Sequence, residues 1–315
     1  MIPRAVHVLA ARQRIRRHVD LTPLRHSAWL SSAAAAPAWL KLECVQRTGS
    51  FKIRGALNAL MQGTRGRHVV TASAGNHGRA IAFAAGMLGL RATVFTPRDA
   101  PRAKVDAIRH HGAELRADAV NYDQAEIDAK AFARESGLPF VSPYNDPDVI
   151  AGAGTIGLEL FEALPDIDTI VVPIGGAGLI SGIAIAARSV APRTRIIGVE
   201  LEVSSAFKES LRHGRITTID AGPSLADGLG GNMDADTITF EIVRRHVDDI
   251  VTVSEAELAD AVRGLAGEEH VIAEGAGAAA PAAILSGKVR GAGNTIAIVS
   301  GSNIDLARLQ AVLSA

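Results

Sequence analysis

The strongest constraint on the fold is an alternation, along the whole chain, of short apolar runs with longer helical stretches. The runs occupy residues 38–42, 68–71, 92–95, 170–172, 196–199, 250–253 and 295–299. Most of them are separated by stretches long enough for a helix of ten or more residues. This alternation predicts an α/β protein with parallel sheets covered by helices on both faces.

The length favours one large or two medium-sized α/β domains. The chain has 315 residues, about twice a typical domain, and it contains no low-complexity linker. Proline-containing turns cluster around residues 143–149. We predict a domain seam there.

The composition indicates an enzyme that acts on a small molecule inside the cell. Acidic and basic side chains are equal in number, 33 of each, which disfavours a nucleic-acid partner. The single cysteine, Cys44, cannot form an internal disulfide, so a reducing, cytoplasmic setting is expected. The longest uncharged stretch, residues 169–187, contains a proline and four glycines. We interpret it as strand, loop and helix rather than a membrane span.

Lys52 is the first candidate for chemistry. Apolar residues recur at helical spacing through residues 51–61, which places Lys52 in the first turn of a helix. The positive end of the helix dipole, and burial beside Phe51, would both favour the neutral, nucleophilic amine. On this segment alone, an ordinary surface lysine on an amphipathic helix remains an open alternative.

A glycine-rich loop at residues 173–182 lies between a predicted strand and a predicted helix. Glycines allow backbone N–H groups to converge on an anion at a helix N-terminus, which indicates a phosphate site. A tight turn needed only for packing is the alternative. A rival interpretation is a nicotinamide-dinucleotide oxidoreductase, because Gly176-Ala177-Gly178 begins a dinucleotide fingerprint and Glu200 could bind a ribose. The match is imperfect, since Ser181 stands where the third glycine should be.

Two further loops follow predicted strands. Residues 72–78 offer serine, asparagine and free amides at a helix N-terminus, which suits a carboxylate, although Ser73 or Asn76 could simply cap the helix. Residues 300–303 form the other loop. Ligands of open parallel sheets bind outside the carboxyl ends of the strands, so these loops can meet in one crevice. An amine, a phosphate cradle and a carboxylate pocket together indicate pyridoxal phosphate (PLP) and an amino acid.

Several motifs, in order along nearly the whole chain, resemble the serine/threonine dehydratase family of fold-type II PLP enzymes. They are Thr22-Pro23-Leu24, Lys41-Leu42-Glu43, residues 49–56, 73–78 and 152–155, the loop at Gly175, Ala226-Asp227-Gly228 and residues 300–303. The resemblance implies two domains of the tryptophan synthase β-like type, each an open, mostly parallel twisted sheet covered by helices. Residues 1–67 with 148–315 would form the large PLP-binding domain, and residues 68–147 the small domain that binds the substrate carboxylate.

The resemblance also implies roles for individual residues. Lys52 would be the catalytic residue that forms the Schiff base with PLP. The remaining cofactor contacts would come from Phe51, Asn76, Gly175, Gly176, Ala177, Gly178, Leu179, Glu274 and Ser300, and the substrate contacts from Ser73, Ala74, Gly75, Asn76, His77 and Gly228. Asn76 would bond the 3-hydroxyl of the cofactor ring, and Ser300 would face the ring nitrogen. Relatives more often have a glycine at Ala177, and a methyl group there is tolerable if its φ is negative.

The implied reaction is elimination of the β-hydroxyl of an amino acid such as L-threonine or L-serine, giving a 2-oxo acid and ammonia. Ala74 replaces the serine of relatives that racemise serine, so racemisation is not expected. Glu200, Ser204 and Ala206 do not reproduce the family's divalent-cation ligands, and no metal is expected. We expect no membrane partner and a homodimer or higher homo-oligomer. A bulkier substrate, such as one derived from hydroxyectoine, is the alternative, because Glu43-Cys44-Val45-Gln46 and residues 76–79 also resemble the hydroxyectoine-utilisation dehydratases.

Overall fold

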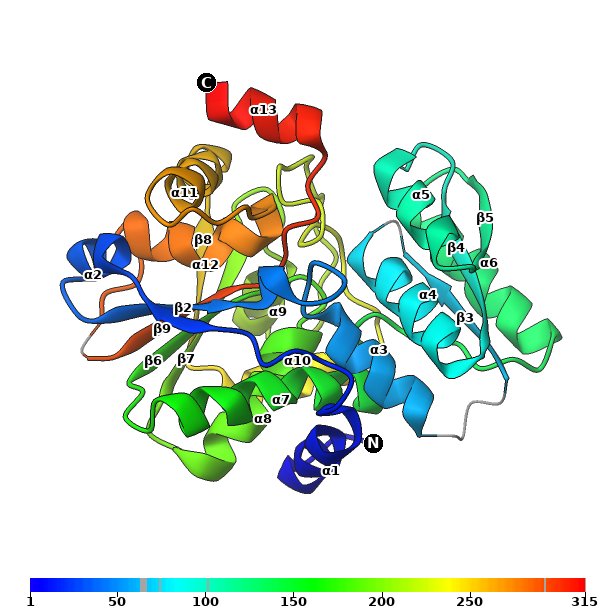
Figure 1. The fold of residues 1–315 in the computed structure, drawn as a ribbon, viewed down its shortest axis with the longest axis horizontal. Helices are drawn as coiled ribbons and strands as arrows, with labels where there is room; N and C mark the ends of the chain where they lie inside the picture. Colours follow the sequence, from blue (N-terminus) through cyan, green and yellow to red (C-terminus); the bar gives the residue numbers. More distant parts are fainter. Residues whose placement is uncertain (63–66, 74, 101, 292, 315) are drawn as a thin grey trace.

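The computed structural model describes residues 1–62, 67–73, 75–100, 102–291 and 293–314, and it contains two separate sheets (Figure 1). The larger sheet has the strand order β1-β2-β9-β6-β7-β8. Its strands run parallel except for the antiparallel pair β1 and β2. They are β1 (Leu24–His26), β2 (Ala38–Leu42), β6 (Thr169–Pro173), β7 (Arg195–Leu201), β8 (Asp249–Val253) and β9 (Thr295–Val299).

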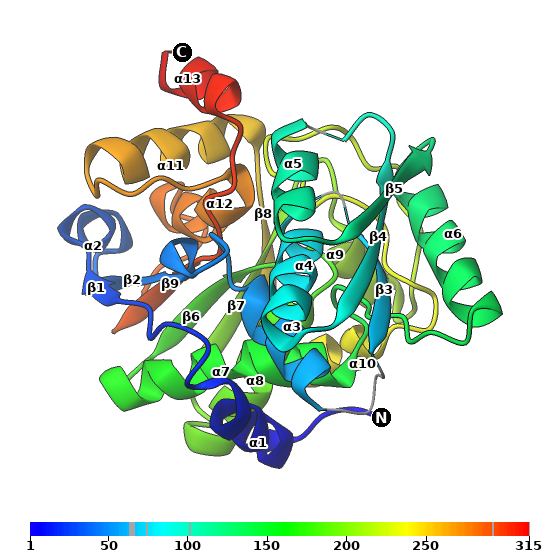
Figure 2. The same cartoon turned by 45° about the vertical axis from the view of Figure 1, so that its right-hand side comes forward.

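Helices cover both faces of the larger sheet (Figures 1 and 2). One face carries α2 (Ala28–Ala34), α11 (Glu255–Gly267), α12 (Gly275–Leu285) and α13 (Leu306–Ser314), and the other carries α7 (Pro147–Ala163), α8 (Gly178–Val190), α9 (Ala206–His213) and α10 (Ile238–His246). Successive residues of the central strand β9 point to opposite faces of the sheet. Ile296 packs in the core beneath α7 and α8, and Ala297 packs in the core beneath α11 and α12. Burial on both faces explains why this strand reads as a continuous apolar run.

The smaller sheet has the order β3-β4-β5, and its strands are all parallel. The strands are β3 (His68–Ala72), β4 (Arg91–Pro97) and β5 (Glu114–Ala119). Helices α4 (Asn76–Leu88) and α5 (Arg102–His110) pack on one face, and α6 (Tyr122–Glu135) packs on the other.

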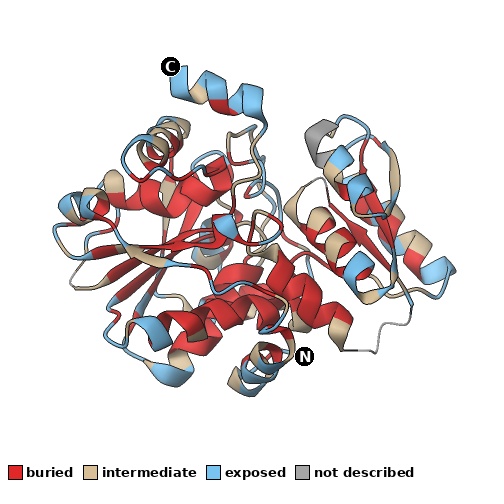
Figure 3. Ribbon diagram, viewed as in Figure 1, coloured by how far each residue is buried: buried red, intermediate tan, exposed pale blue. Residues whose placement is uncertain are grey.

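Helix α3 (Lys52–Met61) connects the two halves of the molecule. It packs against α7 on one side and α4 on the other, and α1 (Ala5–Ile15) lies beside α7. A short 3-10 turn, η1 (Glu43–Val45), follows β2. Figure 3 shows that α3 is among the most completely buried helices, which makes it a firm support for its first residue.

The predicted α/β class and the predicted strands are confirmed, and strands 38–42 and 295–299 keep their predicted bounds. Strands β1 and β5 were not predicted. The two sheets lie on either side of α3, but the domain bounds themselves stay a prediction. Among the described residues, no helix is both long enough and apolar enough to cross a membrane.

Candidate active site

Lys52 is the first residue of α3, directly after the N-cap Phe51. Its side chain is partly buried, and Nζ donates a 2.9 Å hydrogen bond to the carbonyl of Pro143. Burial lowers the pKa of Lys52 to about 8, although the negative charge of Glu274 acts in the opposite direction. Lys52 is therefore not an exposed surface lysine, and about one tenth of its amine is neutral at pH 7.

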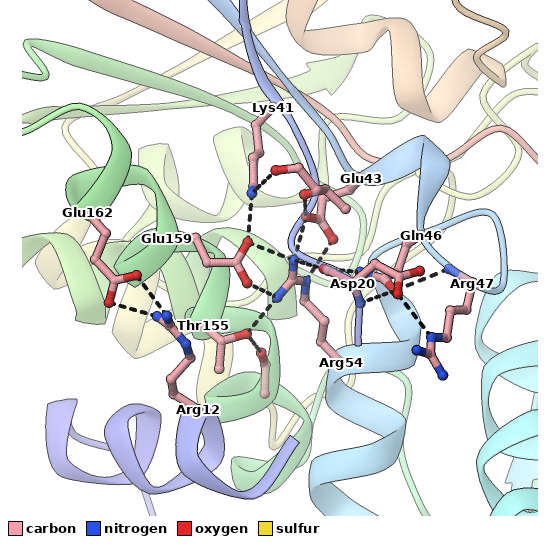
Figure 4. A network of polar contacts seen from close by, with 12 residues as sticks. Arg12, Asp20, Lys41, Glu43, Gln46, Arg47, Arg54, Thr155, Glu159 and Glu162 are labelled. Atoms are coloured by element: carbon pink, nitrogen blue, oxygen red, sulfur yellow. Dashed lines mark hydrogen bonds and ion pairs between the residues drawn. The ribbon is translucent and has the colours of Figure 1, made fainter. Parts of the chain in front are cut away.

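A cluster of buried charges anchors α3 two residues after Lys52 (Figure 4). The Arg54 guanidinium forms paired bonds to Glu43 at 2.8 and 2.9 Å and to Glu159 at 2.6 and 2.9 Å. Lys41 Nζ donates to Glu159 at 2.6 Å. Two cations thus balance two carboxylates, and none of these side chains is more than 4% exposed. The cluster connects α3 to β2, η1 and α7.

The glycine-rich loop joins β6 to α8, as predicted. Helix α8 begins at Gly178, and Ala177 is its N-cap with φ +63°. The condition on which the alanine was judged tolerable is therefore not met, because this is the left-handed region in which a Cβ costs about 1 kcal/mol. A side chain at Gly176 would overlap the ring of Tyr144, which lies against the loop.

The loop can hold an anion. Ser181 N donates to the N-cap carbonyl of Ala177, so the N–H groups that precede it have no partner within the helix. Free N–H groups and the helix dipole together favour a phosphate. At residue 175, a Cβ would come within 2.9 Å of the Gly228 carbonyl, so the stretch containing Gly228 lies directly against the cradle.

The loop at residues 72–78 ends at the N-terminus of α4. The N-cap is Gly75, which makes no side-chain cap bond, and Ser73 Oγ instead accepts a 3.1 Å bond from Gly75 N. Neither Ser73 nor Asn76 is therefore the cap. Burial, followed by the charge of Lys52, lowers the pKa of His77 to about 3, so this imidazole is neutral at physiological pH. Ala74 lies outside the described residues.

Backbone and side-chain bonds bring together the turn before Lys52, the loop at residues 72–78 and the loop at residues 300–303. The Ser300 carbonyl accepts a 3.1 Å bond from Phe51 N, and Ser300 Oγ donates to the carbonyl of Ala276 at 3.2 Å. Asn76 Nδ2 donates to Glu274 Oε1 at 2.6 Å. A cavity of about 400 Å³ opens beside this point, lined in part by Gly75, Asn76, Glu274, Ser302 and Asn303. The loops at residues 72–78 and 300–303 and the carboxylate of Glu274 thus lie side by side, next to the turn that leads to Lys52.

The structure disfavours the dinucleotide interpretation. Both carboxylate oxygens of Glu200 accept 2.8 Å bonds from the backbone N–H groups of Phe207 and Lys208 in the first turn of α9. They therefore serve α9 rather than a ribose. Ser204, which stands at one of the family's divalent-cation positions, accepts a hydrogen bond from Gly231 N through its Oγ. Within the described ranges, no three His, Cys, Asp or Glu side chains gather as a metal site would require.

Several contacts at the site were not predicted from the sequence. The Pro143 carbonyl contacts Lys52, Tyr144 packs on the glycine loop, and Arg79 with Asn303 forms a polar contact at the cavity. Pro143 and Tyr144 lie in the predicted seam, which was the available signal. Asn303 belongs to the nominated loop at residues 300–303, but the pattern does not indicate its pairing with Arg79, because the two residues are far apart along the chain.

Comparison with known proteins agrees with this geometry. The family described as "Pyridoxal-phosphate dependent enzyme" matches residues 15–301. L-threonine ammonia-lyase of Thermotoga maritima is 43% identical over 308 residues, covering 96% of this chain and 76% of that protein. The catabolic L-threonine dehydratase of Escherichia coli (strain K12) is 41% identical, covering 97% and 94%.

Solved structures show the same fold. Maize serine racemase superimposes with a TM-score of 0.92 at 33% identity, covering 100% of this chain and 98% of that one. The T.th. threonine deaminase gives a TM-score of 0.90 at 36% identity, covering 96% and 99%. Family match, fold and the cradle-and-lysine geometry agree, and the chain belongs to the family of pyridoxal-phosphate dependent enzymes.

Proposed function

We propose that the protein is a PLP-dependent ammonia-lyase that dehydrates and deaminates a β-hydroxy amino acid such as L-threonine or L-serine, releasing a 2-oxo acid and ammonia. The observation that carries the proposal is Lys52, a partly buried amine with its pKa lowered to about 8, in the first turn of a helix anchored by a charge cluster. The likeness to threonine ammonia-lyases over almost the whole chain supports it.

In this proposal each loop has one task. Lys52 is the catalytic residue, and Phe51 packs against the cofactor ring. The amides of residues 175–179 hold the phosphate, while Asn76, Glu274 and Ser300 contact the ring. Ser73 and the amides of residues 74–77 bind the substrate carboxylate, and Gly228 borders the substrate.

The bound cofactor supplies an electron sink for the charge left at Cα. Lys52 removes the Cα proton, which it can accept because its amine is partly neutral near pH 7. Ser300 carries no charge, so it cannot hold a proton on the ring nitrogen as a carboxylate would. This would favour prompt loss of the β-hydroxyl over a long-lived carbanion, and the proton that Lys52 takes from Cα would balance the hydroxide that leaves as water.

A panel of amino acids tests the proposed activity. Serine, threonine, 3-hydroxyaspartate, phenylserine and hydroxyectoine-derived compounds would each be incubated with the PLP-loaded protein, and 2-oxo acid and ammonia measured. We expect turnover of at least one β-hydroxy amino acid and its loss in Lys52→Ala. Lys208→Ala, at an exposed position in α9, is the matched control and should keep full activity. Absence of 2-oxo acid from the whole panel would refute the proposal.

A bulkier substrate is the second candidate. A Cβ built at Gly230 or Gly231 meets no atom within 4 Å, so no side chain or backbone atom obstructs this exposed stretch close to Gly228. Larger hydroxyamino compounds, including those derived from hydroxyectoine, would have room there. Higher kcat/KM for such compounds than for threonine in the panel would favour this candidate.

Location and assembly complete the proposal. We place the protein in the cytoplasm, supported by the buried single thiol of Cys44, whose pKa burial raises to about 12. We also propose a homodimer or higher homo-oligomer. Light scattering after size-exclusion chromatography tests the assembly, and a monomer of 32.8 kDa would contradict it.

A further inference from the structure

A chain of four polar side chains crosses the top of the cavity from α4 to the loop after β9. Arg79 Nη1 donates to Asn303 Oδ1 at 2.6 Å, and Asn303 Nδ2 donates to Asn76 Oδ1 at 2.6 Å. Asn76 Nδ2 in turn donates to Glu274 Oε1 at 2.6 Å. Arg79 and Asn76 are three residues apart on α4, so their side chains lie on the same side of that helix.

Arg79 and Glu274, the two end residues of this series of side chains, determine the direction of its hydrogen bonds. A guanidinium has only donors, and a carboxylate has only acceptors. With its oxygen occupied by Arg79, Asn303 must direct its NH2 group to the other side, where it meets both Asn76 Oδ1 and the Thr48 carbonyl at 2.9 Å. Asn76 is then obliged to present its own NH2 group to Glu274. An amide flipped at either asparagine would oppose acceptor to acceptor.

Asn303 is held firmly in this role. The turn before Lys52 packs against Asn303. A Cβ at Gly49, where φ is +72°, would lie only 2.5 Å from Asn303 Oδ1. The neighbouring Ser302 is bonded to the same turn through its N–H to the Gly49 carbonyl at 2.8 Å. Arg79 has a further donor in reserve, because its buried Nε makes no hydrogen bond within the described residues. The chain therefore connects α4 directly to the turn that leads to Lys52.

We propose that Arg79 and Asn303 are positioning residues that set the amide orientation of Asn76. Asn76 then offers an N–H donor, and not an acceptor, to the 3-hydroxyl oxygen of the cofactor ring. This inference rests on the proposed roles of Lys52 and Asn76. A donor at that position stabilises the oxygen in its anionic form, and an acceptor destabilises it. Arg79 thus acts on the cofactor through two amides without touching it.

The test is the pH dependence of the visible absorbance of the PLP-loaded protein, together with the affinity of the apoprotein for PLP. Asn303→Asp keeps the oxygen that Arg79 contacts but replaces the NH2 group with a second acceptor. We expect the midpoint of the absorbance change to rise by about one pH unit and PLP binding to weaken about tenfold. Arg79→Met should shift both in the same direction, and Arg79→Lys should restore part of the effect.

The double variant separates positioning from a general structural role. If Arg79 acts through Asn303, the double variant Arg79→Met with Asn303→Asp shifts the midpoint no further than Asn303→Asp alone. Arg134→Met, at an exposed position in α6, is the control and should change nothing. Circular dichroism establishes that each variant is folded.

Two results would overturn the inference. One is an unchanged midpoint and PLP affinity in folded Asn303→Asp, and the other is additive shifts in the double variant. Failure of the proposed function gives a different result, because the wild-type protein would then show no PLP absorbance at all or no turnover in the substrate panel.

Discussion

At the scale of single residues, the pKa of Lys52 has a direct consequence for loading of the cofactor. Attachment of PLP requires the neutral amine. With the pKa lowered to about 8, the neutral fraction at pH 8 is about one half, against well under one hundredth for an ordinary lysine. We therefore expect the attachment rate of the apoprotein to rise through pH 8 and to level off near pH 9. Stopped-flow absorbance between pH 6.5 and 10 measures it.

Glu274→Gln is the control for this experiment, because the direction in which it shifts the pKa of Lys52 is known. The charge of Glu274 raises the pKa of Lys52, so its removal should move the midpoint of the rate profile to lower pH. A midpoint near 10.5 in the wild-type protein, or an upward shift in the variant, would contradict the account.

Ala177 carries the second prediction at this scale. Its φ of +63° is strained for a residue with a Cβ, and glycine relieves that strain. We expect Ala177→Gly to raise the free energy of unfolding by about 1 kcal/mol, measured by urea denaturation. Ala184→Gly, in the interior of α8, is the comparison and should lower it by about the same amount. If both substitutions changed the free energy of unfolding by equal amounts in the same direction, backbone strain at Ala177 would not explain the effect.

At the scale of elements, the buried charge cluster explains why α3 holds Lys52 in place. Burial alone would raise the pKa of Glu43, yet Arg54 keeps it below its ordinary value. Removing one partner from such a cluster leaves buried charge uncompensated. We expect Glu159→Gln to lower the free energy of unfolding by about 3 kcal/mol.

The same helix provides the matched control for this change. Glu162, one turn later on α7, pairs with Arg12 but is 60% exposed. Glu162→Gln should cost less than about 1 kcal/mol, because water screens the pair. Urea unfolding of both variants measures the difference, and similar costs for the two would show that burial does not set the strength of the cluster.

The sequence predicted most elements but not the contacts between them. Strands that are buried on both faces, such as β9, are apolar throughout and were recognised. Strand β5 was missed because it lies at a sheet edge and its run Glu-Leu-Arg-Ala-Asp-Ala has the composition of a helix. The Arg54 cluster was missed as well, since periodicity does not reveal which buried charges face one another.

At the scale of the whole molecule, the site arises where two sheets meet across α3. Each loop follows a strand or precedes a helix, so the local sequence was sufficient to nominate it. Their convergence depends on the position of β9 between β2 and β6, although β9 comes last along the chain. That order is a tertiary property, and the residue pattern did not predict it. The condition of a negative φ at Ala177 is not met, and the sequence could not show this because the loop as a whole determines the φ value.

We propose that Lys52 is the residue that binds PLP covalently. Reducing the PLP-loaded protein with borohydride and mapping its peptides by mass spectrometry tests this most directly. We expect one pyridoxyl group per chain, on the peptide that contains Lys52, and none in Lys52→Ala. A pyridoxyl group on another lysine, or unchanged labelling of the variant, would contradict it.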